Sequence, residues 1–229
     1  MKSLLYKEFR LAMHPLCYVF ALVFPIMLLI PNFPLFIGTL YIIPGFTILF
    51  LGANKGQQSN DLLYSTLLPV RKKDIVLARL ITVTIIQVVS IILCSCLVPL
   101  SQLIKSNIAS QGGTGAEAPG LTLDGYLSII GIILTGFALS DLIFFPIYYK
   151  KGKSIVFSSI MTILFFSIYI IVFTVLPAMI SGFEWYVNFM CFSGIGNQII
   201  VFSVGLLLYI GIHYLVYRIS SKRLEKVDF

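Results

Sequence analysis

One acidic residue, Asp141, lies alone inside a long apolar run of the sequence. A charge buried in a membrane span is costly, so such a residue is a candidate functional site. Asp141 precedes Lys150 by nine residues, which is about 13 Å along a helix. It could pair with Arg79, bind a proton or a cation during transport, or form a structural contact facing a wet vestibule. We favour the structural role.

The sequence contains neither a complete phosphate-binding motif nor a zinc-protease motif. A phosphate-binding loop needs Gly-x-x-x-x-Gly-Lys-Ser/Thr. Gly152-Lys153-Ser154 supplies only the end of that pattern, because position 147 is isoleucine. The two histidines, His14 and His213, lie in separate apolar runs, and no His-Glu-x-x-His zinc motif is present. We therefore expect no catalytic residue, no metal site and no cofactor of its own in this chain.

The composition is that of a membrane protein. Of its 229 residues, 59% are hydrophobic and 11% are charged, and the mean hydropathy is +1.00. A soluble domain has about a quarter of its residues charged, so lipid must be the solvent for much of this chain. The net charge of +7 comes without a nucleic-acid-binding motif, and we expect no nucleic acid partner.

Six stretches are long and apolar enough to cross a bilayer as helices, each needing about 20 residues. We expect an all-α fold, a single transmembrane domain over residues 1–229. A re-entrant hairpin is the alternative for the first two stretches. The expected helices are 12–30, 35–53, 75–100, 126–148, 155–180 and 197–217.

The cations fall on one side of this arrangement. Of the 16 Lys and Arg residues, 15 lie before the first span, in or next to the connection between the second and third, between the fourth and fifth, or after the sixth, and only Lys105 lies on the other side. Cytoplasmic loops carry the excess of Lys and Arg. Both termini are therefore expected in the cytoplasm, and the protein in the cell membrane as a multi-pass protein.

The connection between the second and third spans has the pattern of a short amphipathic helix. Ser59 or Asn60 can cap its start, Asp61 suits the positive end of the helix dipole, and Pro69 stops it. Its leucines share one face. Such a helix could lie on the membrane surface, or its apolar side chains could fill a groove on a cytosolic partner.

Three segments resemble type-2 ABC exporter permeases. They are Met1–Phe9, the run Leu67-Leu68-Pro69-Val70-Arg71-Lys72-Lys73-Asp74-Ile75-Val76-Leu77-Ala78-Arg79, and Pro146–Lys153. The second run is similar to that of a compact six-helix bacterial branch, which usually has a small polar residue at the position of Lys72. Members of that branch export amphipathic cytolysin-like peptides or confer bacteriocin immunity.

The resemblance implies a dimer of permease chains, each docking one cytosolic ABC ATPase that binds ATP and Mg. Residues 3–11 would form a connecting helix on the inner leaflet, and residues 59–68 the coupling helix that docks the ATPase. The docking residues would be Ser59, Asp61, Leu62, Leu63, Tyr64, Leu67 and Leu68.

We therefore expect the membrane permease subunit of an ABC exporter, in contact with lipid, a second permease chain and a separate ATPase. Its cargo would be an amphipathic peptide or another hydrophobic compound. Two alternatives stay open. One is a non-enzymatic membrane immunity or binding protein, and the other is an ion-coupled carrier centred on Asp141. Asp141 and Arg79 are the candidate functional charges within the membrane.

Overall fold

The computed structural model describes residues 2–12, 19, 23, 26, 70–110, 126–151, 155–172 and 195–226. Their regular secondary structure is helical, and this part of the chain contains no strand. The expected helices 12–30 and 35–53 and the coupling segment 59–68 lie almost wholly outside these residues. The count of six spans and the side of the termini therefore stay predictions.

Within the described residues, three helices are long and apolar enough to cross a membrane: α5, α6 and α10. The shorter helix α7 is also apolar, and a short N-terminal helix, α1, continues into a π-helical turn, η1. The elements are α1 Lys2–Lys7, η1 Glu8–Ala12, α5 Lys72–Ser110, α6 Tyr126–Lys151, α7 Ile155–Ile170 and α10 Ile195–Glu225.

The helices that contain the third and sixth expected spans extend beyond the expected ends. Helix α5 has 39 residues and runs to Ser110 instead of residue 100, and Pro99 lies inside it without ending it. At 1.5 Å per residue it measures about 58 Å, well beyond a hydrocarbon core of about 30 Å. Helix α10 extends to Glu225 instead of residue 217. The end of an apolar run predicts where the chain leaves the lipid. The helix itself can continue from there into water.

The other two described spans begin where they were expected. Helix α6 covers Tyr126–Lys151 against the expected 126–148. Helix α7 starts at Ile155, as expected, and its described α-helical part ends at Ile170. The connecting helix expected at residues 3–11 corresponds to α1 and η1, which together cover Lys2–Ala12.

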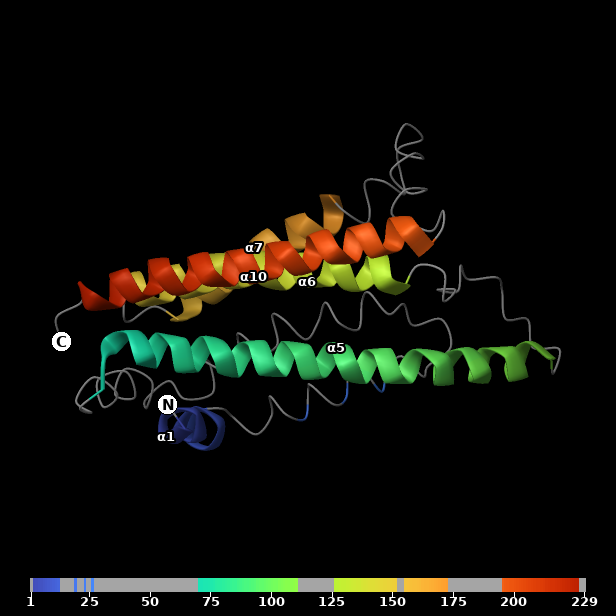
Figure 1. Ribbon diagram of the computed structural model, residues 1–229, viewed down its shortest axis with the longest axis horizontal. Coiled ribbons are helices and arrows are strands. Elements are labelled where there is room, and N and C mark those ends of the chain that lie inside the picture. The colour runs from blue at the N-terminus through green and yellow to red at the C-terminus, as the bar shows by residue number, and fades with distance from the viewer. Residues whose placement is uncertain are drawn as a thin grey trace.

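Helix α6 is the centre of the described bundle. In its most apolar stretch 61% of the residues are buried, against 33% in α5 and 28% in α10. Helix α10 packs along α6, α7 packs against α6, and α5 lies beside α10 (Figure 1). Helix α1 contacts α5 and is seen nearly end-on in the same view, so it runs across the direction of the long helices.

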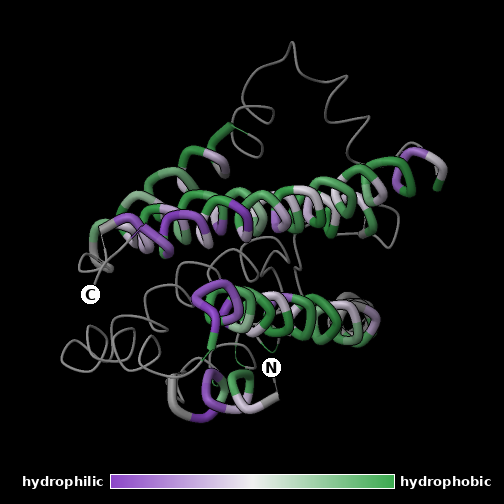
Figure 2. Tube along the Cα trace, turned by 60° about the vertical axis from the view of Figure 1, so that its left-hand side comes forward, coloured by the Kyte–Doolittle hydropathy of each residue, from purple (hydrophilic) through white to green (hydrophobic). Residues whose placement is uncertain are grey.

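Hydrophobic residues dominate the middle of the long helices, and hydrophilic ones gather towards their ends (Figure 2). Large apolar side chains are exposed on the outer faces of α5 and α10, including Ile92 at 55%, Leu207 at 70% and Ile210 at 58%. Apolar faces of this extent are rare on a monomer surrounded by water. They fit a bundle whose solvent is lipid.

A cluster of aromatic and aliphatic residues joins α5, α6 and α10 near the end that carries their cations. Its α6 members stack along one another, with ring centroids 5.9 Å apart for Phe144 and Tyr148 and 6.3 Å apart for Phe145 and Tyr149. The buried members of the cluster are Val76, Leu80, Ile86, Phe144, Phe145, Tyr148, Tyr149, Val216 and Leu224.

Two glycines allow the backbones of α6 and α10 to touch. A Cβ atom added to Gly205 would lie 2.5 Å from the carbonyl oxygen of Gly131, and one added to Gly131 would lie 2.7 Å from the carbonyl oxygen of Val201. Small residues at such crossings let membrane helices approach closely, where packing holds them together. This contact fixes α10 on α6.

Replacing Gly205 with alanine should therefore destabilise the protein, whereas Gly211→Ala should not. The new methyl group at position 205 overlaps backbone and forces α10 away from α6, and such overpacking costs about 1–3 kcal/mol. A Cβ atom at Gly211 meets nothing within 4 Å, and alanine favours a helix over glycine by about 1 kcal/mol. Thermal unfolding of the detergent-solubilised variants measures both. Equal melting temperatures for the two variants would contradict the proposed contact.

Candidate functional site

Asp141 lies on α6 and is 1% exposed. Its Oδ2 atom accepts a hydrogen bond from Gln87 Nε2 of α5 at 2.8 Å. The same oxygen lies 3.3 Å from His213 Nε2 of α10. Its other oxygen, Oδ1, has no hydrogen-bond partner among the described residues. The carboxyl group therefore connects three helices through one oxygen atom.

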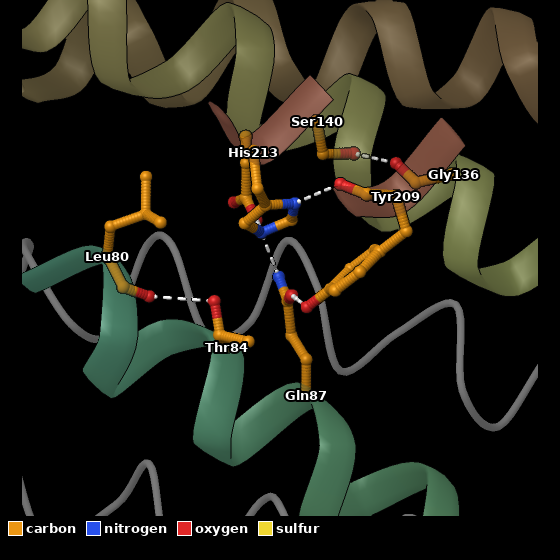
Figure 3. A network of polar contacts seen from close by, with 8 residues as sticks. Leu80, Thr84, Gln87, Gly136, Ser140, Tyr209 and His213 are labelled. Carbon is orange, nitrogen blue, oxygen red and sulfur yellow. Dashed lines mark hydrogen bonds and ion pairs between the residues drawn. The ribbon is translucent and has the colours of Figure 1, made fainter. Parts of the chain in front are cut away.

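Tyr209 completes this network from α10 (Figure 3). Its hydroxyl donates to Gln87 Oε1 at 2.7 Å, and its backbone carbonyl oxygen lies 2.9 Å from His213 Nδ1. The rings of Tyr209 and His213 are 4.1 Å apart at their centroids. We call Gln87, Asp141, Tyr209 and His213 the central polar network. All four are at most 8% exposed, so their hydrogen bonds are shielded from competition with water.

A second buried cluster ties the N-terminal segment to α5 and α6. Arg79 is 3% exposed and Glu8 is 1% exposed. Arg79 Nε and one terminal nitrogen lie 3.1 Å and 3.4 Å from the two carboxylate oxygens of Glu8, which is a two-pronged contact. Its other terminal nitrogen donates to the Tyr148 hydroxyl at 3.0 Å. Such forked pairs are among the strongest hydrogen bonds of charged groups. We call these three residues the Glu8–Arg79 clamp.

The cationic ends of α5, α6 and α10 meet at the same end of the bundle. Lys73 at the start of α5 lies 3.3 Å from Glu225 at the end of α10. Arg223 of α10 donates to the backbone carbonyl oxygen of Pro146 in α6. The sequence predicted that these cations belong to one side, and the packing of the three helices agrees with it.

A shallow apolar groove runs over α6 between α7 and α10, with a volume of about 410 Å³. Its polar groups are the hydroxyls of Thr135 and Tyr169, which lie 2.8 Å apart, and Tyr169 also donates to the carbonyl oxygen of Ile132. The groove suits an apolar occupant. It is lined by Gly131, Ile132, Thr135, Leu139, Tyr169, Ile200, Val201, Val204, Gly205 and Leu208.

The structure does not bring Asp141 and Arg79 together, although the sequence suggested that they could pair. Arg79 pairs with Glu8 instead, and Asp141 contacts Gln87 and His213. Gln87 of α5 makes an interhelical hydrogen bond to Asp141 of α6. The functional role of Asp141 stays a prediction.

Sequence reasoning missed Glu8 and His213. Glu8 lies in the expected connecting helix at residues 3–11, and it is the one acid before the first apolar run. His213 was dismissed because it lies far from His14, whereas its partner is a carboxylate. A polar residue in an apolar run needs an internal partner, and this rule applied to His213 as much as to Asp141. The predicted docking residues, Ser59 to Leu68, lie outside the described residues.

One protein family matches the sequence over residues 3–223, and its description is ABC-2 family transporter protein. The match covers nearly the whole chain and overlaps every helix described above. No curated protein and no solved structure matches the chain significantly.

Removing the acid of the Glu8–Arg79 clamp should destabilise the protein strongly. Glu8→Gln removes the carboxylate that pairs with the buried Arg79 guanidinium, and breaking a buried pair in this way costs about 3–5 kcal/mol. Thermal unfolding measures the loss, and limited proteolysis should show the N-terminal segment released from α5.

The matched control is Lys73→Gln, which breaks an ion pair whose side chains are 53% and 45% exposed. An exposed pair contributes about 0–1 kcal/mol, so this variant should unfold within a few degrees of the unmodified protein. A loss as large as that of Glu8→Gln, or no loss in Glu8→Gln, would show that burial of the clamp is unimportant.

Proposed function

Because the chain belongs to the ABC-2 transporter family, we propose that it forms the translocation path of an ATP-binding-cassette exporter and draws its energy from a separate cytosolic ATPase. The observation that carries this proposal is the family match over residues 3–223. The helices α5, α6 and α10, each long and apolar enough to span a membrane, support it.

The ATPase is placed in a partner chain because this sequence lacks a phosphate-binding loop of its own. Gly152-Lys153-Ser154 matches the end of such a loop, but the position of its first glycine, five residues earlier, is occupied by Ile147. ATP and Mg would then be bound by the partner, and the role of this chain would be to move in response.

We place the cationic end of the bundle in the cytoplasm. Helix α5 begins with Lys72 and Lys73, Lys150 lies in the last turn of α6, and Lys222 and Arg223 lie in the last turn of α10. These residues share one end of the bundle, which is the pattern of a cytoplasmic face. The connection that precedes α5, including residues 59–68, would then face the ATPase.

The Glu8–Arg79 clamp offers a route for force from that connection into the bundle. Arg79 is seven residues from the start of α5 at Lys72, about 10 Å along the helix. It holds Glu8 of the N-terminal segment and Tyr148 of α6. A push on the start of α5 would thus reach the N-terminal segment and α6 together, because both are bound to the same guanidinium group.

The outer apolar faces of α5 and α10 would contact lipid and a second permease chain of the same or a related sequence. The cargo we propose is an amphipathic peptide or another hydrophobic compound. The apolar groove between α7 and α10 is compatible with such a cargo. The membrane would be the cytoplasmic membrane of a bacterium.

A second candidate function, an ion-coupled carrier, is favoured by one observation, the buried carboxyl group of Asp141. The two functions differ in their energy source. Efflux from cells or vesicles that stops on depletion of ATP, while an ion gradient is maintained, supports the exporter. Efflux that continues without ATP and stops when the gradient is dissipated supports the carrier.

Docking of the ATPase is testable by co-purification. The double variant Leu63→Asp/Leu67→Asp should lose a co-purifying ATPase, because carboxylates replace the apolar side chains that would fill its groove. Leu103→Asp places one carboxylate near the far end of α5 and should retain the ATPase. Retention of the ATPase by the Leu63/Leu67 variant, at normal expression, would exclude residues 59–68 as the docking segment.

A further inference from the structure

The hydrogen positions in the central polar network follow from the chemistry of its atoms. His213 Nδ1 lies 2.9 Å from the carbonyl oxygen of Tyr209. A carbonyl oxygen carries no hydrogen, so the hydrogen between these two atoms must belong to Nδ1. In a neutral imidazole the other nitrogen, Nε2, then has a lone pair and no hydrogen.

That second nitrogen faces a carboxyl oxygen. His213 Nε2 and Asp141 Oδ2 lie 3.3 Å apart, within ion-pair range, although Nε2 does not meet the stricter geometry of a hydrogen bond. If His213 were neutral and Asp141 ionised, two lone pairs would face each other in a buried site. The contact is stable only when one further proton lies on either atom.

The amide of Gln87 does not supply that proton. Its nitrogen donates to Asp141 Oδ2 at 2.8 Å, and its oxygen accepts from the Tyr209 hydroxyl at 2.7 Å. Exchanging the two amide atoms would turn the Gln87 oxygen towards Asp141, and the carboxyl group would then have to be protonated to bond to it. In both orientations of the amide the site therefore holds one proton more than a neutral imidazole beside an ionised carboxylate would have.

We infer that Asp141 and His213 form a proton-binding site in the middle of the bundle and share one proton between them. With that proton the pair has no net charge, as an imidazolium beside a carboxylate or as a neutral imidazole beside a carboxylic acid. A neutral pair costs far less to bury in a membrane span than a lone carboxylate.

The groups around the site leave this charge balance unchanged. From α5 the site is faced by Gln87, from α10 by Tyr209, and from α6 by Ser140, whose hydroxyl donates to the carbonyl oxygen of Gly136. The charges of the Glu8–Arg79 clamp, which neutralise each other, lie further along α5, towards its start. Arg79 precedes Gln87 by eight residues, about 12 Å along α5.

Binding of this proton is coupled to the packing of α6 against α5 and α10. With the proton present, Asp141 joins α6 to α10 through His213 and to α5 through Gln87. Without it, α10 carries a lone pair against the carboxylate, and α6 and α10 repel each other at this point. The folded state therefore holds a proton that the unfolded chain releases as the pH rises, so stability conferred by the pair should fall with rising pH.

The inference is testable on the purified protein in lipid nanodiscs, without knowledge of the cargo. The chain has two histidines, so the variant His14→Gln labelled with ¹⁵N-histidine gives nitrogen signals from His213 alone. Nitrogen chemical shifts show which ring nitrogens carry hydrogen. The infrared carbonyl band of a carboxylic acid, assigned by its loss in Asp141→Asn, shows whether Asp141 is protonated.

Near neutral pH we expect one of two patterns. Either both ring nitrogens carry hydrogen and the acid band is absent, or Nδ1 alone carries hydrogen and the acid band is present. A neutral ring without the acid band, a hydrogen on Nε2 alone, or an imidazolium together with the acid band would each overturn the inference.

Thermal stability provides a second measurement that a merely structural contact would not affect. The melting temperature of the unmodified protein should fall towards that of Asp141→Asn as the pH is raised, because only the unmodified protein has a shared proton to lose. A difference in melting temperature that stays constant with pH would contradict the proposal. If Asp141→Asn fails to fold, the nitrogen spectrum of His14→Gln, read together with the presence or absence of a carboxylic-acid band in the same variant near neutral pH, still decides the matter, because that variant retains the central polar network.

Discussion

A carboxyl group among apolar helices has no water to solvate it, and Asp141 therefore depends on groups that other helices bring to it. Gln87 comes from α5, and His213, with Tyr209 beside it, comes from α10. In hydrocarbon, an unsatisfied polar group costs several kcal/mol. Each of these contacts therefore restricts how α5 and α10 can sit on α6. The position of α6 at the centre of the described bundle follows from the same requirement, since α6 carries the group that needs partners.

Close packing and polar contacts act on the same pair of helices. Gly131 and Gly205 let the backbones of α6 and α10 touch, and the contact between Asp141 and His213 lies about ten residues further along α6. Apolar packing alone resists separation but tolerates sliding and rotation of one helix on another. The polar pair has a direction and a register, so it selects one arrangement among those that the glycine contact permits.

The sequence predicted the elements better than it predicted their partners. Apolar runs located α5, α6, α7 and α10, because lipid imposes a minimum length and hydropathy reports it directly. The far ends of α5 and α10 were placed too early, since a helix that leaves the membrane meets no barrier to continuing in water. The sequence also failed to identify which charged residues pair with each other. Asp141 and Arg79 were candidates for each other because both are charged and near the same end, and only the packing of η1 against α5 reveals that Glu8 is closer to Arg79.

Pairing of this kind cannot be read from a single sequence. His213 lies 72 positions from Asp141, and Glu8 lies 71 positions from Arg79. Helical periodicity specifies which residues share a face of one helix, but not which faces of different helices meet. A charge in an apolar run could be predicted to need a partner. The identity of that partner depended on the rotation of α10 about its own axis, which the glycine contact and the aromatic cluster determine together.

The Glu8–Arg79 clamp and the central polar network each connect α5 to α6, and the two connections lie about two helical turns apart. Arg79 and Gln87 both project from α5 towards α6, where they meet Tyr148 and Asp141. If α5 slid along α6, both contacts would shift by the same distance, and a hydrogen bond is lost within about 1 Å of such a shift. The two helices therefore have few positions in which both clusters are satisfied. A bundle held in this way changes between discrete arrangements instead of deforming continuously, and movement of α5 past α6 requires that the clamp and the network release together or that the segment between them bends.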